Sequence, residues 1–188
     1  MNIEDLKDRL DKSLGTLDGK HIIMLKSDSK NYSDSVFETL RYVTGKGMGG
    51  VYLTSALPQE YISEKLEKYG INTENLYFID TVSCMMGSTP GERGRCALVK
   101  SPGSLDDIEM LAYKLIDKIE PEEKFLLIDS VSNLLIYNDA CKLVKFSESL
   151  IKYMRSKKIR GVIASVAQQL DEGFHRDIAM FCDIIIKI

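Results

Sequence analysis

Short apolar runs recur along the chain and alternate with stretches of helical periodicity. Most of these runs are continuously apolar, which is typical of strands buried on both faces of a sheet. The pattern predicts strands over residues 21–25, 51–54, 76–80, 125–129, 161–165 and 184–186.

The intervening stretches place apolar residues on one face at helical spacing. They predict helices over about 34–43, 59–69, 105–119 and 139–157. Strands that alternate with helices predict an α/β fold, specifically a three-layer sandwich with a mostly parallel central sheet. At 188 residues, we expect residues 1–188 to form a single domain.

Two segments stand apart from this alternation. Residues 1–15 form an amphipathic pattern (Ile3, Leu6, Leu10, Leu14), which predicts a helical extension packed outside the sheet. Residues 83–103 are irregular, and 96–100 within them predict a short edge strand. Arg93 and Arg95 in this segment either bind an anion, or act on the site of a neighbouring subunit, or are side chains of a polar loop.

Composition excludes several functional classes. The net charge is −3 without a basic run, so we do not expect nucleic-acid binding. No apolar stretch approaches the roughly 18 residues that span a bilayer, and the first residues are charged, so we expect no membrane association and a cytoplasmic protein. The four cysteines form no C-x-x-C pair, which favours reduced thiols and no metal site.

The segment between the first predicted strand and helix lies where a nucleotide-binding protein has G-x-x-x-x-G-K-[ST]. In this chain Asp28 and Ser33 occupy the glycine positions, Asp34 occupies the lysine position, and Ser35 keeps the final hydroxyl. Glycines let backbone N–H groups close around phosphate, and the lysine neutralises its charge. We therefore expect a reshaped loop, with Asp34 pointing into solvent at the helix N-terminus.

Four stretches in order carry a family resemblance: residues 35–37, 50–60 with 66–71, 125–135, and 161–165 with 179–185. In these stretches the chain resembles the RecA-like P-loop ATPases, in particular the KaiC-like branch found in archaea. The resemblance implies a RecA-like P-loop NTPase fold, with Asp129 and Ser130 in the Walker B position.

The departures from the family pattern bear on function. The family's catalytic glutamates correspond to residues 55–57, where this chain has no carboxylate, and Glu60 is displaced. An acidic Asp34 a few ångströms from a γ-phosphate would cost several kcal/mol. We therefore expect no catalytic residue and no cofactor. Asp129 is then either a residual metal or ligand group, or a cap on the following turn. Gln168 and Gln169 lie where the family places a polar sensor, and loop hydrogen bonding is the alternative.

Three functions remain open. The first is a non-catalytic domain, a pseudo-ATPase that acts by binding a protein partner or itself and is not an enzyme. The second is an ATP–Mg²⁺ binding protein in which Lys30 takes the phosphate role. The third is a module for a non-nucleotide small ligand. We expect a monomer or small homo-oligomer, with a dimer favoured, and residues 1–15 or 85–95 as the contact. The alternative for residues 1–15 is packing on their own sheet.

Overall fold

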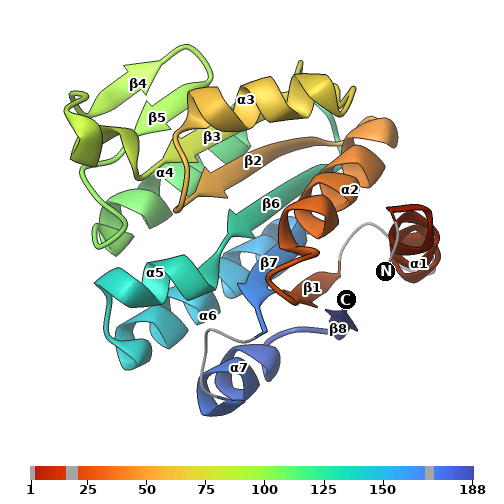
Figure 1. The fold of residues 1–188 in the computed structure, drawn as a ribbon. Helices are drawn as coiled ribbons and strands as arrows, with labels where there is room; N and C mark the ends of the chain where they lie inside the picture. The colour runs from red at the N-terminus through yellow and green to blue at the C-terminus, as the bar shows by residue number, and fades with distance from the viewer. Residues whose placement is uncertain (1–2, 16–20, 168–171) are drawn as a thin grey trace.

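The computed structural model describes residues 3–15, 21–167 and 172–188. Its centre is a sheet in the order β4-β5-β3-β2-β6-β7-β1-β8 (Figure 1). Every strand pair is parallel except β4–β5. The strands are β1 (Ile22–Ser27), β2 (Gly49–Thr54), β3 (Leu76–Asp80), β4 (Gly91–Arg93), β5 (Cys96–Leu98), β6 (Lys124–Asp129), β7 (Arg160–Val166) and β8 (Ile184–Lys187).

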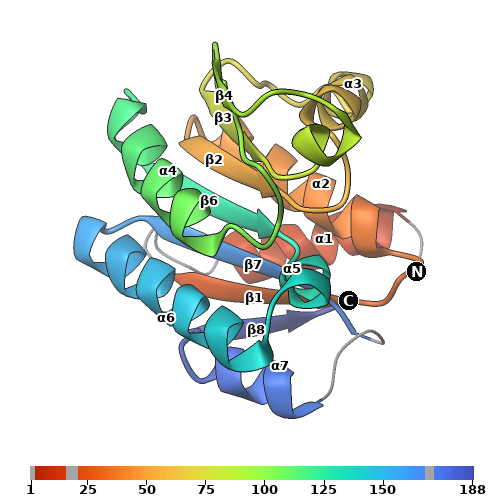
Figure 2. The ribbon, with the colours of Figure 1, turned by 90° about the vertical axis from the view of Figure 1, so that its left-hand side faces the viewer.

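Helices cover both faces of the sheet and make three layers (Figure 2). One face is covered by α1, α2 and α3, and the other by α4, α5, α6 and α7. The helices are α1 (Ile3–Gly15), α2 (Tyr32–Gly45), α3 (Gln59–Lys68), α4 (Leu105–Lys118), α5 (Val131–Tyr137), α6 (Ala140–Lys157) and α7 (Glu172–Ala179), with a 3₁₀ turn η1 (Ser83–Met86).

The central strand β6 shows why the strands are continuously apolar. Phe125 and Leu127 pack toward α1, α2 and α3, whereas Leu126 and Ile128 pack toward α4, α5, α6 and α7. Successive side chains of a strand point to opposite faces, and both faces are covered here. Asp129 ends the strand and therefore points to the α2 side.

A close approach between β2 and β6 requires a glycine. Gly50 pairs with Phe125, whose ring lies across it. A Cβ atom at Gly50 would lie 2.3 Å from that ring. The Phe125 ring thus occupies the space that a side chain at position 50 would need. The packing of the core at this point therefore requires both Gly50 and Phe125.

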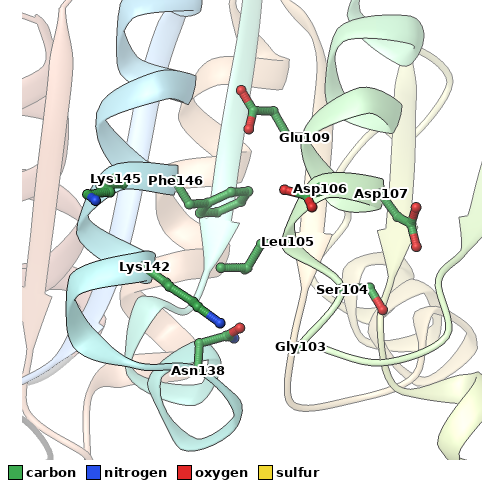
Figure 3. A pocket seen from close by; sticks show the side chains of 10 residues that line it. All are labelled: Gly103, Ser104, Leu105, Asp106, Asp107, Glu109, Asn138, Lys142, Lys145 and Phe146. Atoms are coloured by element: carbon green, nitrogen blue, oxygen red, sulfur yellow. The ribbon is translucent and has the colours of Figure 1, made fainter.

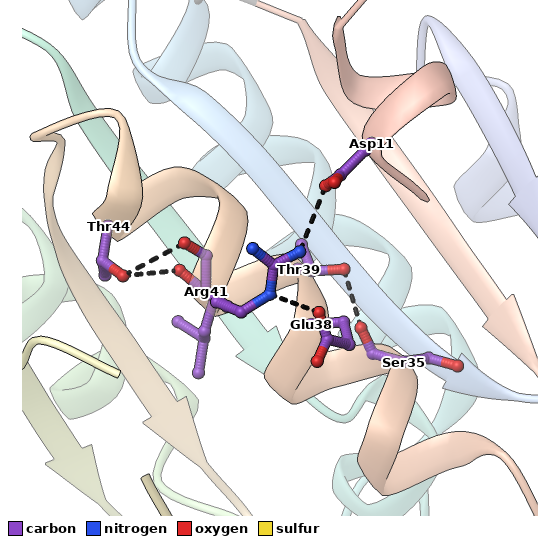
Figure 4. Close-up of polar contacts among 7 residues, drawn as sticks. Asp11, Ser35, Glu38, Thr39, Arg41 and Thr44 are labelled. Atoms are coloured by element: carbon purple, nitrogen blue, oxygen red, sulfur yellow. Dashed lines mark hydrogen bonds and ion pairs between the residues drawn. The ribbon is translucent and has the colours of Figure 1, made fainter. Parts of the chain in front are cut away.

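The N-terminal helix buries its apolar face within its own domain. Leu6, Leu10 and Leu14 are buried in the cluster that also contains β1 and α2 residues. Arg41 of α2 bonds to Asp11 at 3.3 Å and to Glu38 in its own helix (Figure 4). This arrangement favours the alternative in which residues 1–15 pack on their own sheet, and it removes their apolar face as a contact for another molecule.

The predicted strands and helices are present, and the differences are local. Helix α2 begins at Tyr32, two residues earlier than expected, so the connecting loop is only residues 28–31. Residues 96–98 form a strand that is not at the edge, because β4 pairs with its outer side. Helix α5 was not predicted, since it follows β6 after a single residue. Among the described residues, no helix is long and apolar enough to cross a membrane.

Candidate functional site

The predicted site residues gather at the carboxyl ends of β1, β2 and β6, where ligands bind in open α/β sheets. A cavity of about 250 Å³ lies there, between α2, α3 and the strand ends. Asp129, Tyr32, Lys65 and Asn133 contribute its main polar groups. Its apolar lining comes from Val36, Phe37, Ala56, Leu57, Ile62 and Val166.

The loop at residues 28–31 is closed by its own side chains. The Asp28 carboxylate accepts hydrogen bonds from the Asn31 backbone N–H at 2.8 Å and from the Asn31 amide at 3.0 Å. No residue from 28 to 35, all within the described chain, has a positive φ. A phosphate nest uses backbone N–H groups that converge in alternating αR and αL conformations. This geometry agrees with the expectation of a reshaped loop.

Of the remaining loop positions that were predicted as site residues, only Ser33 lines the cavity. Ser35 is fully buried, and its hydroxyl donates to the Asn31 carbonyl at 2.7 Å and lies 3.0 Å from the Ser27 hydroxyl. Lys30 and Ser33 are exposed. Asp34 was expected to point into solvent, but it is half-buried and accepts a hydrogen bond from the Tyr69 phenol of the α3 terminus.

Asp129 has two phenols as partners. Tyr32, in the first turn of α2, donates to one carboxylate oxygen, and Tyr52, in the middle of β2, donates to the other. Asp129 is only 9% exposed and Tyr52 is fully buried. Hydrogen bonds to an ionised carboxylate are among the stronger ones in proteins. The two tyrosines therefore provide a hydrogen-bond donor for each oxygen of this carboxylate. In the ATPases that the chain resembles, the carboxylate at this position would instead contact metal-bound water.

Burial and the two phenols act in opposite directions on this carboxylate. Burial raises the pKa of Asp129, and the hydrogen bonds from Tyr32 and Tyr52 lower it, with burial the larger effect. Burial and the nearby Asp129 charge raise the pKa of both phenols well above their usual value. The phenols therefore remain donors at neutral pH. Among the described residues, no three His, Cys, Asp or Glu side chains form a metal-binding group.

Serines next to Asp129 connect the ends of β2 and β6. The Ser55 hydroxyl donates to the Asp129 carbonyl and accepts from the Ser130 N–H, both at 2.9 Å. The Ser130 hydroxyl accepts from the Asn133 N–H at 3.2 Å and so caps α5. The cap that we considered for Asp129 is thus made by Ser130. The hydroxyl of Ser55 therefore holds the ends of the two strands together.

Other carboxylates near the site do not replace the missing glutamates. Glu60 is exposed in the first turn of α3, and residues 55–57 carry no carboxylate. Asp80, at the end of β3, is fully buried and accepts from the Gln59 N–H at 2.7 Å and from the Ser83 hydroxyl at 2.6 Å. It therefore holds the starts of α3 and η1, and it is not among the residues that line the cavity.

One cation lies at the cavity without a carboxylate partner. Lys65 of α3 is half-buried, and its ammonium group lies 4.9 Å from the centre of the Tyr61 ring and 6.0 Å from that of Phe37. Within residues 3–15, 21–167 and 172–188 it makes no ion pair. Aromatic faces attract a cation but do not neutralise it. Lys65 thus gives the cavity a positive group that no part of the described chain neutralises.

A larger cavity, of about 560 Å³, lies between the starts of α4 and α6 (Figure 3). Leu105 and Phe146 form its apolar base, and Asp106 and Lys142 stand on opposite helices. It contains none of the predicted site residues. We place the functional site at the smaller cavity, because that one holds a buried titratable group with a perturbed pKa.

Three of the site's main residues were not identified from the sequence. Tyr52 had a detectable signal, since a tyrosine inside a buried aliphatic strand needs a hydrogen-bond partner. Tyr32 and Lys65 had none. Of the predicted arginines, Arg95 donates to the Glu74 carbonyl and Arg93 is an exposed residue of β4. Gln168 and Gln169 lie outside the described residues.

Comparison with known proteins shows the fold. A KaiC-like protein of the hyperthermophilic archaeon Pyrococcus horikoshii is 11% identical, with a TM-score of 0.61 over 89% of this chain and 71% of that one. An uncharacterised protein of the same archaeon, solved with an unknown peptide, is 14% identical, with a TM-score of 0.68 over 96% and 82%. No protein-family description and no curated protein matches the sequence. The chain has a KaiC-like, RecA-like fold.

Proposed function

We propose that this KaiC-like, RecA-like fold serves as a non-catalytic domain, a pseudo-ATPase that acts by binding another protein or a second copy of itself. The observation that carries the proposal is the engagement of both Asp129 oxygens by Tyr32 and Tyr52. In a working ATPase the carboxylate at this position holds Mg²⁺ together with phosphate oxygens.

Nucleotide binding would have to overcome several separate obstacles. Mg²⁺ at Asp129 would have to displace at least one phenol, and it binds poorly without phosphate co-ligands. Phosphate would approach Asp34 in place of a lysine, and charge repulsion there opposes it. The exposed Lys30 has no contact that directs it to the cavity. These features together support a domain that does not use ATP.

The surface around the site supports a binding role. Large apolar side chains are exposed where β2, β3 and β6 end, and two of them, Met86 and Ile136, are 72% and 73% exposed. Exposed apolar side chains in the segments that follow these strands are available for contacts with a protein partner. The set comprises Leu57, Tyr61, Met85, Met86, Ile136 and Tyr137. The structural neighbour that was solved with a peptide bound is consistent with this role.

A thermal-shift titration with ATP–Mg²⁺ tests the nucleotide part. We expect no change in melting temperature at millimolar ATP. A ligand at 100 times its Kd would stabilise the fold by about 2.7 kcal/mol, which is roughly 5–11 °C for a domain of this size. A shift of that size that disappears in Lys30→Met would contradict the proposal and assign the phosphate role to Lys30.

Sedimentation velocity and crosslinking in cells test the binding part with a matched pair of variants. Met86→Glu alters the exposed apolar set defined above. Met180→Glu alters a methionine of similar exposure, 77%, which lies between α7 and the edge strand β8 and is not part of that set. We expect Met86→Glu to weaken self-association or remove a crosslinked partner, and Met180→Glu to leave both unchanged. Equal effects of the two variants, or an ATP-dependent hexamer, would refute the proposed mode of action.

A further inference from the structure

We infer that the cavity beside Asp129 binds a small apolar carboxylate, enclosed by the apolar side chains of α2 and α3 and paired with Lys65. The inference rests on the proposed function, because the cavity is available only where nucleotide does not occupy it. It extends that function by assigning the site a ligand class.

The size of the cavity sets the size of the ligand. Its volume of about 250 Å³ corresponds to about eight waters at their liquid volume of roughly 30 Å³ each. Pockets for drug-sized ligands range from about 300 to 1,000 Å³. A compact aliphatic or aromatic acid fits this volume, and so does the last residue of a peptide.

The walls select an apolar body. Val36 and Phe37 come from α2, and Leu57 and Ile62 come from the start of α3 and the segment before it. Three of these residues are at most 3% exposed, so they are fixed by the core and form a preformed surface. Leu57 is 38% exposed and lies at the rim. Covering such a surface with an apolar group removes it from water, which favours binding.

Lys65 selects the charge of the ligand. Its half-buried ammonium group lies beside the Tyr61 and Phe37 rings and has no carboxylate partner among the described residues. The carboxylate of a ligand would accept a charge-assisted hydrogen bond from the Lys65 ammonium group. A cationic ligand would be repelled, and a neutral one would leave the ammonium group unpaired.

The carboxylates of the protein itself do not compete for this position. Asp34 accepts from Tyr69, and Glu38 is paired with Arg41. Asp129 is held by the two phenols at the base of the cavity. These three acidic groups therefore already have partners, whereas Lys65 has no carboxylate partner among the described residues.

A ligand titration followed by NMR of the full-length, ¹⁵N-labelled chain tests the inference. The probes are phenylacetate and its uncharged analogue phenylacetamide. We expect saturable shifts around Phe37 and Lys65, with the acid bound at least about tenfold more tightly than the amide, a difference of about 1.4 kcal/mol. Equal affinities, or no saturable shift, would overturn the inference.

Two variants separate the charge of Lys65 from the charge of the helix. Lys65→Met keeps the aliphatic stem and should remove the preference for acid over amide. Lys68→Met removes an exposed lysine from the end of the same helix and should leave the preference intact. Loss of preference in both variants, or in neither, would overturn the role of Lys65. The amide spectrum of each variant verifies that it is folded.

Further titrations identify the source of the carboxylate. Gly-Gly-Leu with a free carboxyl end, compared with its amidated form, represents a peptide terminus, and phenylacetate represents a free acid. Tighter binding of either acid supports the inference and assigns its source. ATP–Mg²⁺ is titrated in parallel. Shifts with ATP–Mg²⁺ but not with the acids would overturn both the inference and the proposed function. If neither binds, the inference fails and the proposed function stands.

Discussion

Removing one phenol from Asp129 should destabilise the fold in a pH-dependent way. Tyr52→Phe keeps the ring in the core, where it packs 5.8 Å from the Phe78 ring, and deletes only the hydroxyl that donates to Asp129. Hydrogen bonds to charged groups contribute about 1.5–3 kcal/mol. At roughly 2–4 °C per kcal/mol for a domain of this size, we expect the melting temperature to fall by roughly 3–12 °C at pH 7.5.

The sign of the pH dependence follows from the pKa of Asp129. Burial already raises that pKa above its usual value, and the phenols lower it. Without the Tyr52 hydroxyl, the pKa rises further, so the folded state binds its proton more readily than the unfolded state does. The destabilisation therefore grows as pH rises through the window between the folded-state pKa of Asp129 in the wild type and its higher folded-state pKa in the variant, and shrinks as pH falls.

Urea unfolding at pH 7.5 and at pH 4.5 measures both effects. Tyr113→Phe is the matched control, because the hydroxyl of this half-buried tyrosine also donates to a carboxylate, Glu109, near the surface. We expect this control to cost less than about 1 kcal/mol. In an Asp129→Asn background the cost of Tyr52→Phe should decrease, since the buried charge is gone.

Two results would refute this reasoning. The first is an equal loss of stability in Tyr52→Phe and Tyr113→Phe at pH 7.5. The second is a loss in Tyr52→Phe that is as large at pH 4.5 as at pH 7.5. Either result would mean that the Tyr52 hydroxyl does not stabilise an ionised Asp129.

Two further predictions concern the core and the thiols. Gly50→Ala should cost at least about 2 kcal/mol in urea unfolding, because its Cβ would lie 2.3 Å from the Phe125 ring. Gly45→Ala, with no atom within 4 Å, should stabilise by about 0.4–1 kcal/mol, and equal effects would contradict the packing described for β2. At pH 8 iodoacetamide should modify the exposed Cys141 first and Cys96 only on unfolding, because burial raises the pKa of Cys96 to about 12. Mass mapping that finds Cys96 modified first would contradict this order.

The sequence predicted the fold well where the apolar pattern was long and continuous. The five principal strands and their parallel arrangement follow from burial on both faces, and β6 lies in the middle of the sheet as expected. The hairpin strand β4 was missed, because Gly91, Glu92 and Arg93 are all exposed and carry no apolar signal. Helix α5 was missed because it is only seven residues long and a single residue, Ser130, separates it from β6.

The prediction of the site rested on comparison with a sequence motif, in which this chain has Asp34 at the lysine position and no carboxylate at residues 55–57. The partners of Asp129 could not be predicted in this way, because they come from distant parts of the chain. Tyr32 and Tyr52 reach Asp129 across 97 and 77 residues, and no local pattern connects them. Asp80, which holds the start of α3, was missed for the same reason.

The two edges of the sheet differ in a way that affects solubility. At one edge, β4 is three residues long, and its Glu92 forms ion pairs with Lys114 and Lys118 of α4. Short, charged edge strands resist pairing with other chains. At the other edge, β8 is apolar over Ile184–Ile186 and, among the described residues, bonds only to β1. Among the described residues, β8 is therefore the edge strand that is left to pair with another chain, and a charge or proline introduced into it should oppose such pairing.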